Sequence, residues 1–393
     1  MIAVVGIGAD GWSGLGDPAR DAVRAAPTIV GSKRQLALLP DDLPGERRPW
    51  PSPIDPLVDD LAAGALEGTA VLASGDPMLH GIGATLARRG AALVVYPHPS
   101  AFAYACARLD WPEAEVELIS TVARPPDALA RALQPRRRVV VFGTADSAAA
   151  VLVDRGFGPS RFVVLEQLGG PDERVIESTA DSWGDRAADP LHVVGIECVA
   201  AEGTPVLPRV PGLPDDGYET DGALTKQALR AATLAALAPL PGALLWDVGA
   251  GSGSIGIEWL RAEPTARAIA VEERDDRAER IECNARRLGV PDLVVVRDRA
   301  PDALGLLDPP DAVFVGGGVG APGLVDACWE ALRGGGRLVA NTVTLEGEGV
   351  VARARAERGG TLTRLEISHA EPLGGFTGWQ AQRPVVQWSV TKP

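Results

Sequence analysis

Leu244-Leu-Trp-Asp-Val-Gly-Ala-Gly-Ser-Gly-Ser254 is the stretch of sequence that decides the fold of the C-terminal half of this chain. An apolar strand runs into Asp247 and a Gly-x-Gly-x-Gly turn, and a second apolar strand, Ala268-Ile-Ala-Val-Glu-Glu273, ends at Glu272. Glycines let the backbone approach a ligand where a side chain would clash. An acidic residue at the end of the next strand can accept both hydroxyls of a ribose. The pattern therefore predicts a nucleotide-type ligand at the ends of two neighbouring strands.

The glycine spacing separates two classes of nucleotide-binding fold. NAD-binding folds place their third glycine one residue later, where it packs a helix. Asp247-Val-Gly-Ala-Gly-Ser-Gly253 instead resembles motif I of the Rossmann-like S-adenosylmethionine (SAM) methyltransferases. A nucleotide-binding dehydrogenase and a bare structural turn are the alternatives. The resemblance implies that SAM is bound by Asp247, Gly249, Ala250, Gly251, Ser252, Gly253 and Glu272.

Length, composition and charge narrow the class of protein. A chain of 393 residues predicts two domains, and 46% hydrophobic with 23% charged residues describes a globular protein. The net charge of −14 disfavours nucleic-acid binding, whose footprint is a basic patch. The four cysteines and four histidines are scattered, which predicts no metal site. No signal peptide or membrane span is evident, so we expect a cytoplasmic protein without membrane contact.

Strand and helix signals alternate along the N-terminal half, which predicts α/β architecture. A helix is expected over Asp17–Ala26, with Asp17 as its N-cap and Pro18 at its first position. The expected strands are Ile2–Gly6, Thr28–Gly31, Ala70–Ser74, Ala92–Tyr96, Val116–Ser120, Arg138–Phe142, Arg161–Leu165 and His192–Ile196.

A proline-rich segment separates the two halves. Residues 201–217 hold four prolines and show no helical periodicity, which predicts a semi-stiff linker between domains at 1–200 and 218–393. The second domain should begin with a helix over Thr225–Ala238. Its later strands are expected at Leu293–Val296, Ala312–Val315, Gly336–Asn341, Thr361–Ser368 and Pro384–Val390.

Gly6-Ile-Gly-Ala-Asp-Gly11 follows a strand and fits the G-x-G-x-x-G pattern of dinucleotide sites. Such a site needs a helix that opens at the turn and an acidic residue about 20 residues on. Here the loop continues to Asp17, and the next strand ends in Val30-Gly-Ser32 without an acid. NAD binding at this turn is therefore disfavoured.

Three segments of the N-terminal half resemble the tetrapyrrole methylases, also called class III methyltransferases. They are Val5-Gly-Ile-Gly-Ala-Asp-Gly-Trp12, Leu72-Ala-Ser-Gly-Asp-Pro-Met-Leu-His-Gly-Ile-Gly83 and Tyr96-Pro-His-Pro-Ser-Ala-Phe-Ala-Tyr-Ala105. In that family SAM lies between two α/β lobes, and the opening glycine loop faces the tetrapyrrole. The resemblance implies that SAM is bound by Gly75, Asp76, Pro77, Gly81, Ser100 and Ala101.

Plainer structural interpretations of these segments stay open. Asp76-Pro77 taken alone is an ordinary turn. His80 and His98 are expected to pack or cap loops in preference to acting as bases. Lys33 and Arg34 are candidates to receive substrate carboxylates, or else they form a solvated helix start.

A two-lobed class III domain ahead of a seven-stranded Rossmann-like methyltransferase domain resembles the family of fused precorrin-6Y methyltransferases (decarboxylating) of cobalamin synthesis. Further matches to that family lie at Gly217–Lys226, Phe314–Gly318 and Ala340–Thr344. The fourth SAM motif of the family reads Gly-Asp-Ala-Pro, whereas this chain has Asp298-Arg-Ala-Pro301. That departure puts the acidic adenine contact in doubt, although the resemblance still places Ala300 against the adenine.

The resemblance implies a bifunctional enzyme with SAM in each domain. The N-terminal domain would methylate carbon 5 of the macrocycle, and the C-terminal domain would methylate carbon 15 and decarboxylate the ring C acetate. The sulfonium of SAM activates the methyl group, and a reduced meso carbon is enamine-like. Positioning of the two reactants can therefore supply much of the catalysis, and neither a strong base nor a metal is required.

The substrate of such an enzyme is a polycarboxylate, so Arg and Lys side chains should line its cleft. Lys226 and Arg230 lie one helical turn apart and are the candidates to bind its carboxylates, a solvated helix face being the alternative. Thr225 is expected to meet SAM or to cap the following helix. The loop Gly374–Trp379 should either cover the macrocycle or connect two strands.

Other functions stay open at this point. An RNA or protein SAM-dependent methyltransferase with a degenerate N-terminal binding module would need a basic groove, which the net charge of −14 disfavours. An N-terminal half that only presents the substrate would leave a single active domain. For the precorrin methyltransferase we expect a small-molecule tetrapyrrole substrate, no nucleic acid and, from the resemblance, a homo-oligomer.

Overall fold

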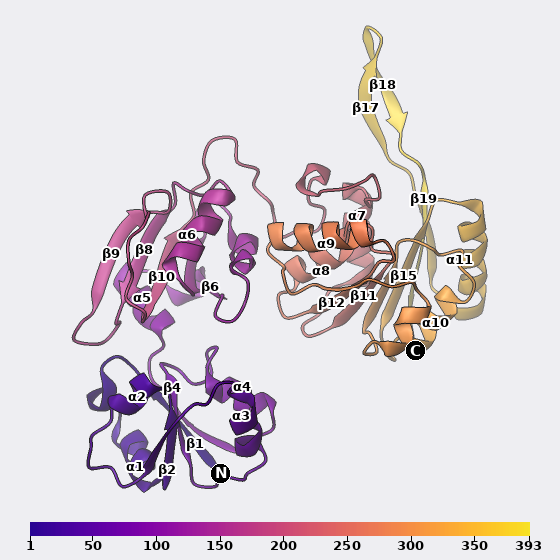
Figure 1. Cartoon of the computed structure of the whole chain (residues 1–393). Coiled ribbons are helices and arrows are strands. Elements are labelled where there is room, and N and C mark those ends of the chain that lie inside the picture. Colours follow the sequence, from indigo (N-terminus) through magenta and orange to yellow (C-terminus); the bar gives the residue numbers. More distant parts are fainter. The chain divides into compact units, whose positions relative to one another are not determined.

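The computed structural model describes residues 1–393, and the chain divides into two compact units, Met1–Thr204 and Pro205–Pro393 (Figure 1). The division falls inside the proline-rich segment. Both units consist of strands and helices in alternation, so the predicted α/β class is confirmed. None of the helices combines the length and the apolar composition that a membrane span requires.

Unit 1 begins with a five-stranded parallel sheet of order β3-β2-β4-β1-β5. Strand β1 lies between β4 and β5 and is apolar in a continuous run, because a parallel sheet is covered on both faces. The elements of this layer are β1 (Ile2–Ile7), η1 (Gly11–Gly14), α1 (Asp17–Ala25), β2 (Thr28–Gly31), α2 (Lys33–Ala37), β3 (Glu46–Pro49), α3 (Asp55–Ala62), β4 (Ala70–Ser74), α4 (Ile82–Arg88) and β5 (Leu93–Tyr96).

A second five-stranded sheet of order β6-β7-β10-β8-β9 completes unit 1. Only β6 and β7 pair in parallel, and the other neighbours are antiparallel. The elements of this layer are α5 (Ala101–Leu109), η2 (Glu113–Glu115), β6 (Val116–Ser120), η3 (Pro126–Ala132), β7 (Arg138–Phe142), α6 (Ala145–Asp154), β8 (Arg161–Glu166), β9 (Arg174–Thr179) and β10 (His192–Glu197).

Departures from the predicted elements of unit 1 have physical causes. The N-cap assignment of Asp17 was wrong: Gly16 caps α1 with extended backbone, and Asp17 and Pro18 fill the first turn. An acidic residue in that turn still complements the helix dipole. Strands β3 and β9 were not predicted, because they are sheet edges with charged and exposed residues in place of an apolar run.

Unit 2 contains a seven-stranded sheet of order β13-β12-β11-β14-β15-β19-β16. The first five strands are parallel, and β19 runs antiparallel to both of its neighbours. Strand β11 is buried along its whole length. Its side chains alternate between two apolar clusters, with Leu245 in one and Leu244 and Trp246 in the other, as the period of a strand requires.

The elements of unit 2 are η4 (Asp215–Gly217), α7 (Gln227–Leu237), β11 (Leu244–Val248), α8 (Ser254–Ala262), β12 (Arg267–Val271), α9 (Asp275–Arg287), β13 (Val294–Val296), η5 (Asp302–Leu306), β14 (Ala312–Val315), α10 (Leu324–Ala331), β15 (Arg337–Thr342), α11 (Leu345–Arg358), β16 (Thr361–Leu365), β17 (Ser368–Leu373), β18 (Phe376–Ala381) and β19 (Val385–Thr391).

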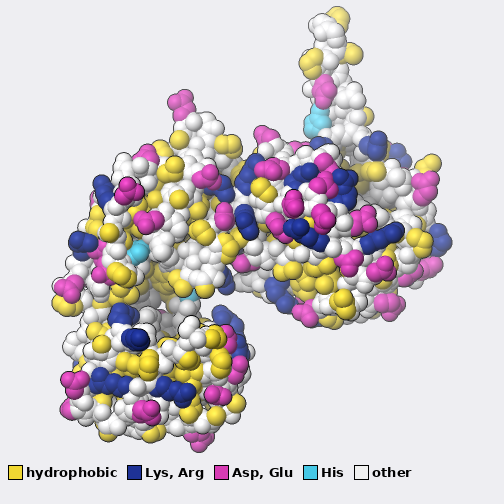
Figure 2. Space-filling model, in the orientation of Figure 1, with side chains coloured by type: hydrophobic (Ala, Val, Ile, Leu, Met, Phe, Trp, Pro, Cys, Tyr) yellow, Lys and Arg dark blue, Asp and Glu magenta, His cyan; other side chains and the backbone are white.

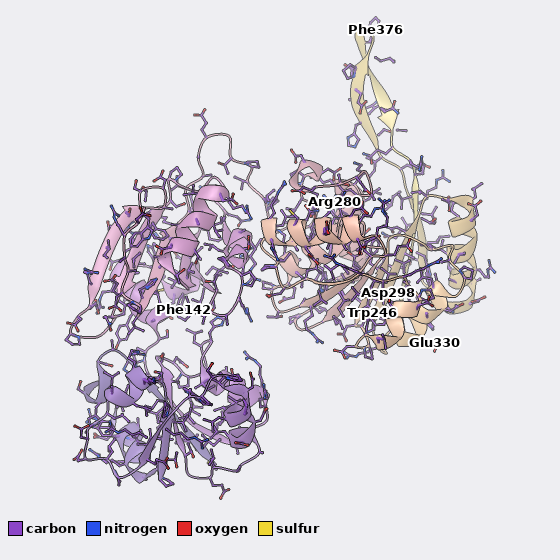
Figure 3. The ribbon with its side chains drawn as sticks, viewed as in Figure 1. Phe142, Trp246, Arg280, Asp298, Glu330 and Phe376 are labelled. Carbon is purple, nitrogen blue, oxygen red and sulfur yellow. The ribbon has the colours of Figure 1, made fainter.

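Strands β17 and β18 form a hairpin that pairs only with itself and projects from the sheet of unit 2 (Figures 1 and 3). Its apolar side chains Leu373, Phe376 and Trp379 are 68%, 83% and 79% exposed. Figure 2 shows hydrophobic side chains along this hairpin. Gly374 and Gly375 connect the two strands, and Phe376–Trp379 belong to β18. The predicted cover over the macrocycle stays a prediction.

The end of the expected linker is bound to unit 2. The buried carboxylate of Glu258 accepts hydrogen bonds from the backbone N–H groups of Gly212 and Leu213 and, at 2.8 Å, from the hydroxyl of Tyr218. It also accepts from Nε of Arg230 at 2.5 Å. The Arg230 guanidinium donates further to the carbonyl oxygen of Leu213, so one ion pair joins α7, α8 and the chain that precedes them.

Removing one partner of this pair should destabilise unit 2. Because Arg230→Met leaves a buried carboxylate uncompensated, we expect the free energy of unfolding to fall by about 3–5 kcal/mol. The exposed pair of Arg297 and Glu282, 2.9 Å apart, provides the control. Arg297→Met should cost less than about 1 kcal/mol. Urea titration with peptide-resolved hydrogen exchange of unit 2 measures both, and equal losses would contradict the account.

Candidate functional site

The strand order of unit 2 fixes where a ligand can bind. Strand β11 lies between β12 and β14, and the chain leaves it on one side and returns on the other. In doubly wound sheets, ligands bind outside the carboxyl ends of the strands at this switch point. The glycine turn after β11 and Glu272 after β12 both lie at that edge.

The glycine turn is packed against backbone from two other loops. A Cβ atom on Gly249 would lie 2.9 Å from Cα of Gly317, and one on Gly251 would lie 2.8 Å from the carbonyl oxygen of Ala223. Gly251 also has a φ of +61°, which favours glycine. Both neighbours belong to segments that the family resemblance singled out. Three segments that are separate in the sequence therefore meet at one place.

Asp247 is buried beneath the glycine turn. Its Oδ2 accepts a hydrogen bond from the N–H of Gly256 at 2.9 Å, whereas its Oδ1 is buried without a partner. Burial raises the pKa of Asp247 to about 7, the hydrogen bond from Gly256 lowers it, and the charge of Glu272 raises it again. A buried carboxyl oxygen without a partner is the kind of group that a ligand donor satisfies.

Glu272 holds the glycine turn from the end of β12. Its Oε2 accepts the N–H of Gly251 at 2.9 Å, and its Oε1 accepts the N–H of Arg274 at 3.2 Å. A carboxylate has about four lone-pair sites, so acceptor capacity is left for ribose hydroxyls. The ribose contact stays a prediction, but the position beside the turn fits it.

The segment before α7 is tied to the same turn. The hydroxyl of Ser252 donates to the carbonyl oxygen of Ala223 at 2.9 Å. Asp221 accepts the N–H of Ala223 at 3.0 Å and Nε of Arg277 at 2.9 Å, and these bonds hold the pKa of Asp221 down at about 2. Asp221 was not predicted, because its only signal is its place in the family-like segment.

The predicted substrate contacts occupy different environments. Lys226 is the N-cap residue of α7, its side chain is half exposed, and its Nζ lies 3.6 Å from Asp215. Thr225 precedes this N-cap, so it is not the capping residue that one alternative expected. Arg230 corrects a prediction: it is fully buried, and its guanidinium is bound to Glu258 and Asp215, so it is not free to receive a substrate carboxylate.

Ala300 lies in the loop between β13 and η5. It packs against the apolar cluster that contains Val248 and Val271, the last residues of β11 and β12. This is the side of the glycine turn where the adenine is expected. Arg299, which stands where the family has an acid, lies 3.9 Å from Glu273.

Three loops also meet at one edge of the first sheet of unit 1. A Cβ on Gly6 would lie 2.3 Å from the carbonyl oxygen of Gly75 and 2.8 Å from the backbone nitrogen of His98. One on Gly75 would lie 3.2 Å from Cα of Ser100. The loops after β1, β4 and β5, which carry the three segments similar to tetrapyrrole methylases, are therefore in contact.

The predicted SAM contacts of unit 1 lie within these loops. Asp76 accepts the N–H two residues on at 2.7 Å, which is the turn that the plainer interpretation expected. Gly81 packs against Pro77, whose oxygen would lie 2.6 Å from a Cβ there. Ser100 caps α5, and Ala101 is its first residue. A helix N-terminus offers free N–H groups to a ligand, so the arrangement suits the prediction.

The loops of the first sheet touch the layer of the second sheet. A Cβ on Gly170 would lie 2.7 Å from Cβ of Ala9, and the ring of His80 lies edge-on to that of Phe142, with 6.2 Å between the ring centroids. This contact agrees with a packing role for His80. Arg34 donates to the hydroxyl of Ser74 at 3.1 Å, and burial lowers its pKa.

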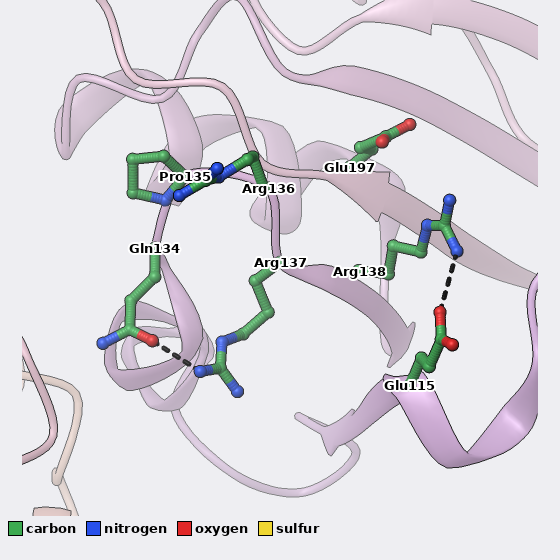
Figure 4. A pocket seen from close by; sticks show the side chains of 7 residues that line it. All are labelled: Glu115, Gln134, Pro135, Arg136, Arg137, Arg138 and Glu197. Atoms are coloured by element: carbon green, nitrogen blue, oxygen red, sulfur yellow. Dashed lines mark hydrogen bonds and ion pairs between the residues drawn. The ribbon is translucent and has the colours of Figure 1, made fainter.

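A surface cavity of about 610 Å³ lies elsewhere in unit 1 (Figure 4). It opens at the start of β7, whereas the candidate loops approach the end of β7 at Phe142. It contains no residue predicted to bind SAM or substrate. No group of three or more His, Cys, Asp and Glu side chains is arranged to hold a metal ion. The lining residues of the cavity are Glu115, Gln134, Pro135, Arg136, Arg137, Arg138 and Glu197.

Two family models match the chain: Tetrapyrrole (Corrin/Porphyrin) Methylases over residues 1–183 and Precorrin methyltransferase domain over residues 216–392. A precorrin-6Y C(5,15)-methyltransferase (decarboxylating) from Sinorhizobium sp is 46% identical over 398 residues, which cover 100% of this chain and 96% of that protein. A protein of the same name from Mycobacterium tuberculosis is 46% identical over 403 residues and 100% of both chains.

A shorter relative also matches. A probable cobalt-precorrin-6B C(15)-methyltransferase (decarboxylating) from Pyrobaculum calidifontis is 34% identical over 182 residues, which cover 44% of this chain and 93% of that protein. This relative therefore has about the length of one unit.

The raised pKa of Asp247 predicts a pH dependence of stability. Between its ordinary value of 3.8 and about 7, the folded carboxyl holds a proton that the unfolded one has lost. Stability should therefore fall as pH rises through this window, by up to about 1.4 kcal/mol per pH unit, and level off above it. Asp247→Asn removes this slope.

The stability of Asp247→Asn relative to the unaltered protein should accordingly increase from pH 5 to pH 7 and then stay constant. Urea midpoints of both proteins at each pH measure the difference. A difference that does not change with pH would show that the carboxyl is ionised throughout.

Proposed function

Since the chain belongs to the family of precorrin-6Y C(5,15)-methyltransferases (decarboxylating), we propose that it divides the reaction of that family between its two units. The protein is a SAM-dependent methyltransferase. Unit 1 methylates carbon 5 of a precorrin-6 type macrocycle. Unit 2 methylates carbon 15 and removes carbon dioxide from the ring C acetate.

One observation carries this proposal: each unit has its own glycine-lined turn at the carboxyl ends of parallel strands. Gly75 lies at the turn in unit 1 and Gly251 at the turn in unit 2. Two turns on two separate sheets support one SAM in each unit. The relative of single-unit length, whose name includes only carbon 15 and decarboxylation, supports separable reactions. An RNA or protein methyltransferase has no comparable support.

The residues of unit 2 act mainly by position. SAM, when bound, supplies a methyl group that its sulfonium already activates. The glycine turn brings backbone close to the cofactor, Glu272 receives the ribose, and Ala300 lies against the adenine. Holding the methyl group in line with carbon 15 can supply several kcal/mol of the acceleration. Oδ2 of Asp247 ties the end of β11 to the first turn of α8 through the N–H of Gly256, and its Oδ1 can accept a hydrogen bond from the ligand.

Lys226 is the residue that we retain for the substrate carboxylates. Its side chain is half exposed, and its Nζ lies 3.6 Å from Oδ2 of Asp215. An ion pair of this length is weaker than one with a direct hydrogen bond. Decarboxylation then needs a macrocycle that accepts the electron pair and surroundings that desolvate the departing carboxylate. When the protein binds the other carboxylates of the macrocycle, the ring C acetate is left free to react.

Four glycine-to-arginine variants test the division of labour. Gly75→Arg should abolish methylation at carbon 5 and spare carbon 15, and Gly251→Arg should do the reverse and also stop decarboxylation. Neighbouring backbone crowds both positions, so an arginine there cannot fit without displacing the turn that would receive the cofactor. Gly90→Arg and Gly242→Arg are the controls, since these glycines also have positive φ but have open space around them. Carbon-13 NMR of products made with labelled SAM reports each carbon separately.

The two control variants separate the effect of backbone strain from the effect of a side chain in the cofactor turn. A positive φ costs any of the four arginines roughly 1–2 kcal/mol. The controls should therefore retain both methylations. If Gly75→Arg or Gly251→Arg folds normally but loses methylation at both carbon 5 and carbon 15, the two sites are not independent.

A further inference from the structure

Asp10 occupies a place in unit 1 that the surrounding glycines leave for it. A Cβ on Gly14 would lie 1.9 Å from its Oδ2, and one on Gly8 would lie 2.6 Å from its Oδ1. The carboxylate thus fills space that any other residue at these two positions would take. Asp10 belongs to the loop after β1, next to Ala9, which contacts the second layer at Gly170. The carboxylate therefore lies where the two layers of unit 1 approach each other.

His98 holds one oxygen of this carboxylate. Its Nε2 lies 3.1 Å from Oδ2 of Asp10, and its Nδ1 lies 3.0 Å from the carbonyl oxygen of Pro99. With hydrogen on Nε2, the imidazole donates to Oδ2 of Asp10 and so fixes the orientation of the carboxylate. His98 therefore holds the Asp10 carboxylate through Oδ2 alone.

The other oxygen of Asp10 has no partner. Its Oδ1 is buried and accepts no hydrogen bond. Leaving a carboxylate oxygen unsatisfied costs free energy, and a purely structural link between two loops needs only Oδ2. The ring centroid of Tyr104 lies 6.3 Å from that of His98. Burial and then the charge of Asp10 raise the pKa of Tyr104, so its hydroxyl stays neutral.

The proposed reaction of unit 1 releases a proton that needs an acceptor. Transfer breaks the bond between sulfur and methyl, forms a bond between that methyl and carbon 5, and leaves S-adenosylhomocysteine and a macrocycle with one additional positive charge. Carbon 5 then bears both hydrogen and methyl. Loss of that hydrogen as a proton restores the conjugated system and the original charge. Because the methylated cation is acidic, a carboxylate is a sufficient base.

We infer that Asp10 is the catalytic residue that accepts this proton at Oδ1, and that His98 is the residue that positions it. The inference rests on the proposed assignment of carbon 5 to unit 1. It adds a proton acceptor to a site where the sequence suggested that positioning alone suffices. The proton passes from carbon 5 to Oδ1 and then to solvent, and no other reactant is needed.

Asp10→Asn tests the inference in the full-length enzyme. The amide keeps the shape of the side chain and an oxygen for His98 but cannot take up the proton. We expect the kcat of carbon-5 methylation to fall by about 100-fold or more, with KM and the affinity for S-adenosylhomocysteine unchanged. Carbon-15 methylation in the same molecule is the internal control and should not change. In Asp10→Asn, loss of the proton should limit the rate, so deuterium at carbon 5 should slow this variant further. The rate of the unaltered enzyme should not change with deuterium.

His98 provides the second pair of variants. His98→Gln retains a donor for Oδ2 and should recover much of the activity that His98→Leu loses. Equal losses in the two variants would overturn the positioning role. If Asp10→Asn does not fold, this pair and its deuterium effects decide the inference.

The role of Asp10 and the assignment of carbon 5 to unit 1 predict different results for these variants. If Gly75→Arg stops carbon-5 methylation while Asp10→Asn proceeds at the normal rate, Asp10 is not the acceptor and the assignment of carbon 5 stands. If Gly75→Arg leaves carbon-5 methylation intact, the assignment itself is wrong.

Discussion

Close contact of backbone with backbone at the carboxyl ends of parallel strands is the constraint on which both units depend. In unit 2, the turn after β11 meets the loop after β14 at Gly249 and Gly317. In unit 1, the end of β1 meets the loop after β4 at Gly6 and Gly75. Strands buried on both faces bring these loops to a common edge, and residues without a Cβ let them touch. Side chains from distant parts of the sequence are thereby brought to one place, as Glu272 is through its bond to the glycine turn.

How much could be predicted from the sequence depended on whether a feature is local. Continuous apolar runs predicted β11 and its neighbours, which the structure confirms. The spacing from Asp247 to Glu272 placed both residues at one edge of the sheet, and the ligand at that edge stays a prediction. Arg230 could not be placed in this way, because its partner Glu258 lies 28 residues on and helical spacing shows only that Lys226 is near. The partners Asp10 and His98 are 88 residues apart, and neither carries a signal that names the other. The hairpin β17–β18 shows no apolar alternation, because it packs on no core.

The overall negative charge of the chain makes individual Lys and Arg side chains important for binding the substrate. The chain has a net charge of −14, yet a precorrin substrate carries several carboxylates. Binding therefore requires local positive groups that overcome the average repulsion. Most Arg side chains in the structure are bound to Asp or Glu, as Arg277 is to Asp221. In unit 2 the half-exposed Lys226 has only the long ion pair with Asp215, at 3.6 Å, and in unit 1 Arg34 donates to the hydroxyl of Ser74. The homo-oligomer and the cytoplasmic location stay predictions.

The central claim is that one chain holds two methyltransferase sites and one decarboxylation step. Mass spectrometry of a precorrin-6 type substrate, incubated with the full-length protein and SAM, tests it most directly. The account predicts a product that has gained two methyl groups and lost one carbon dioxide. A product with a single additional methyl group, at saturating SAM and with the protein folded, would contradict the presence of two active units.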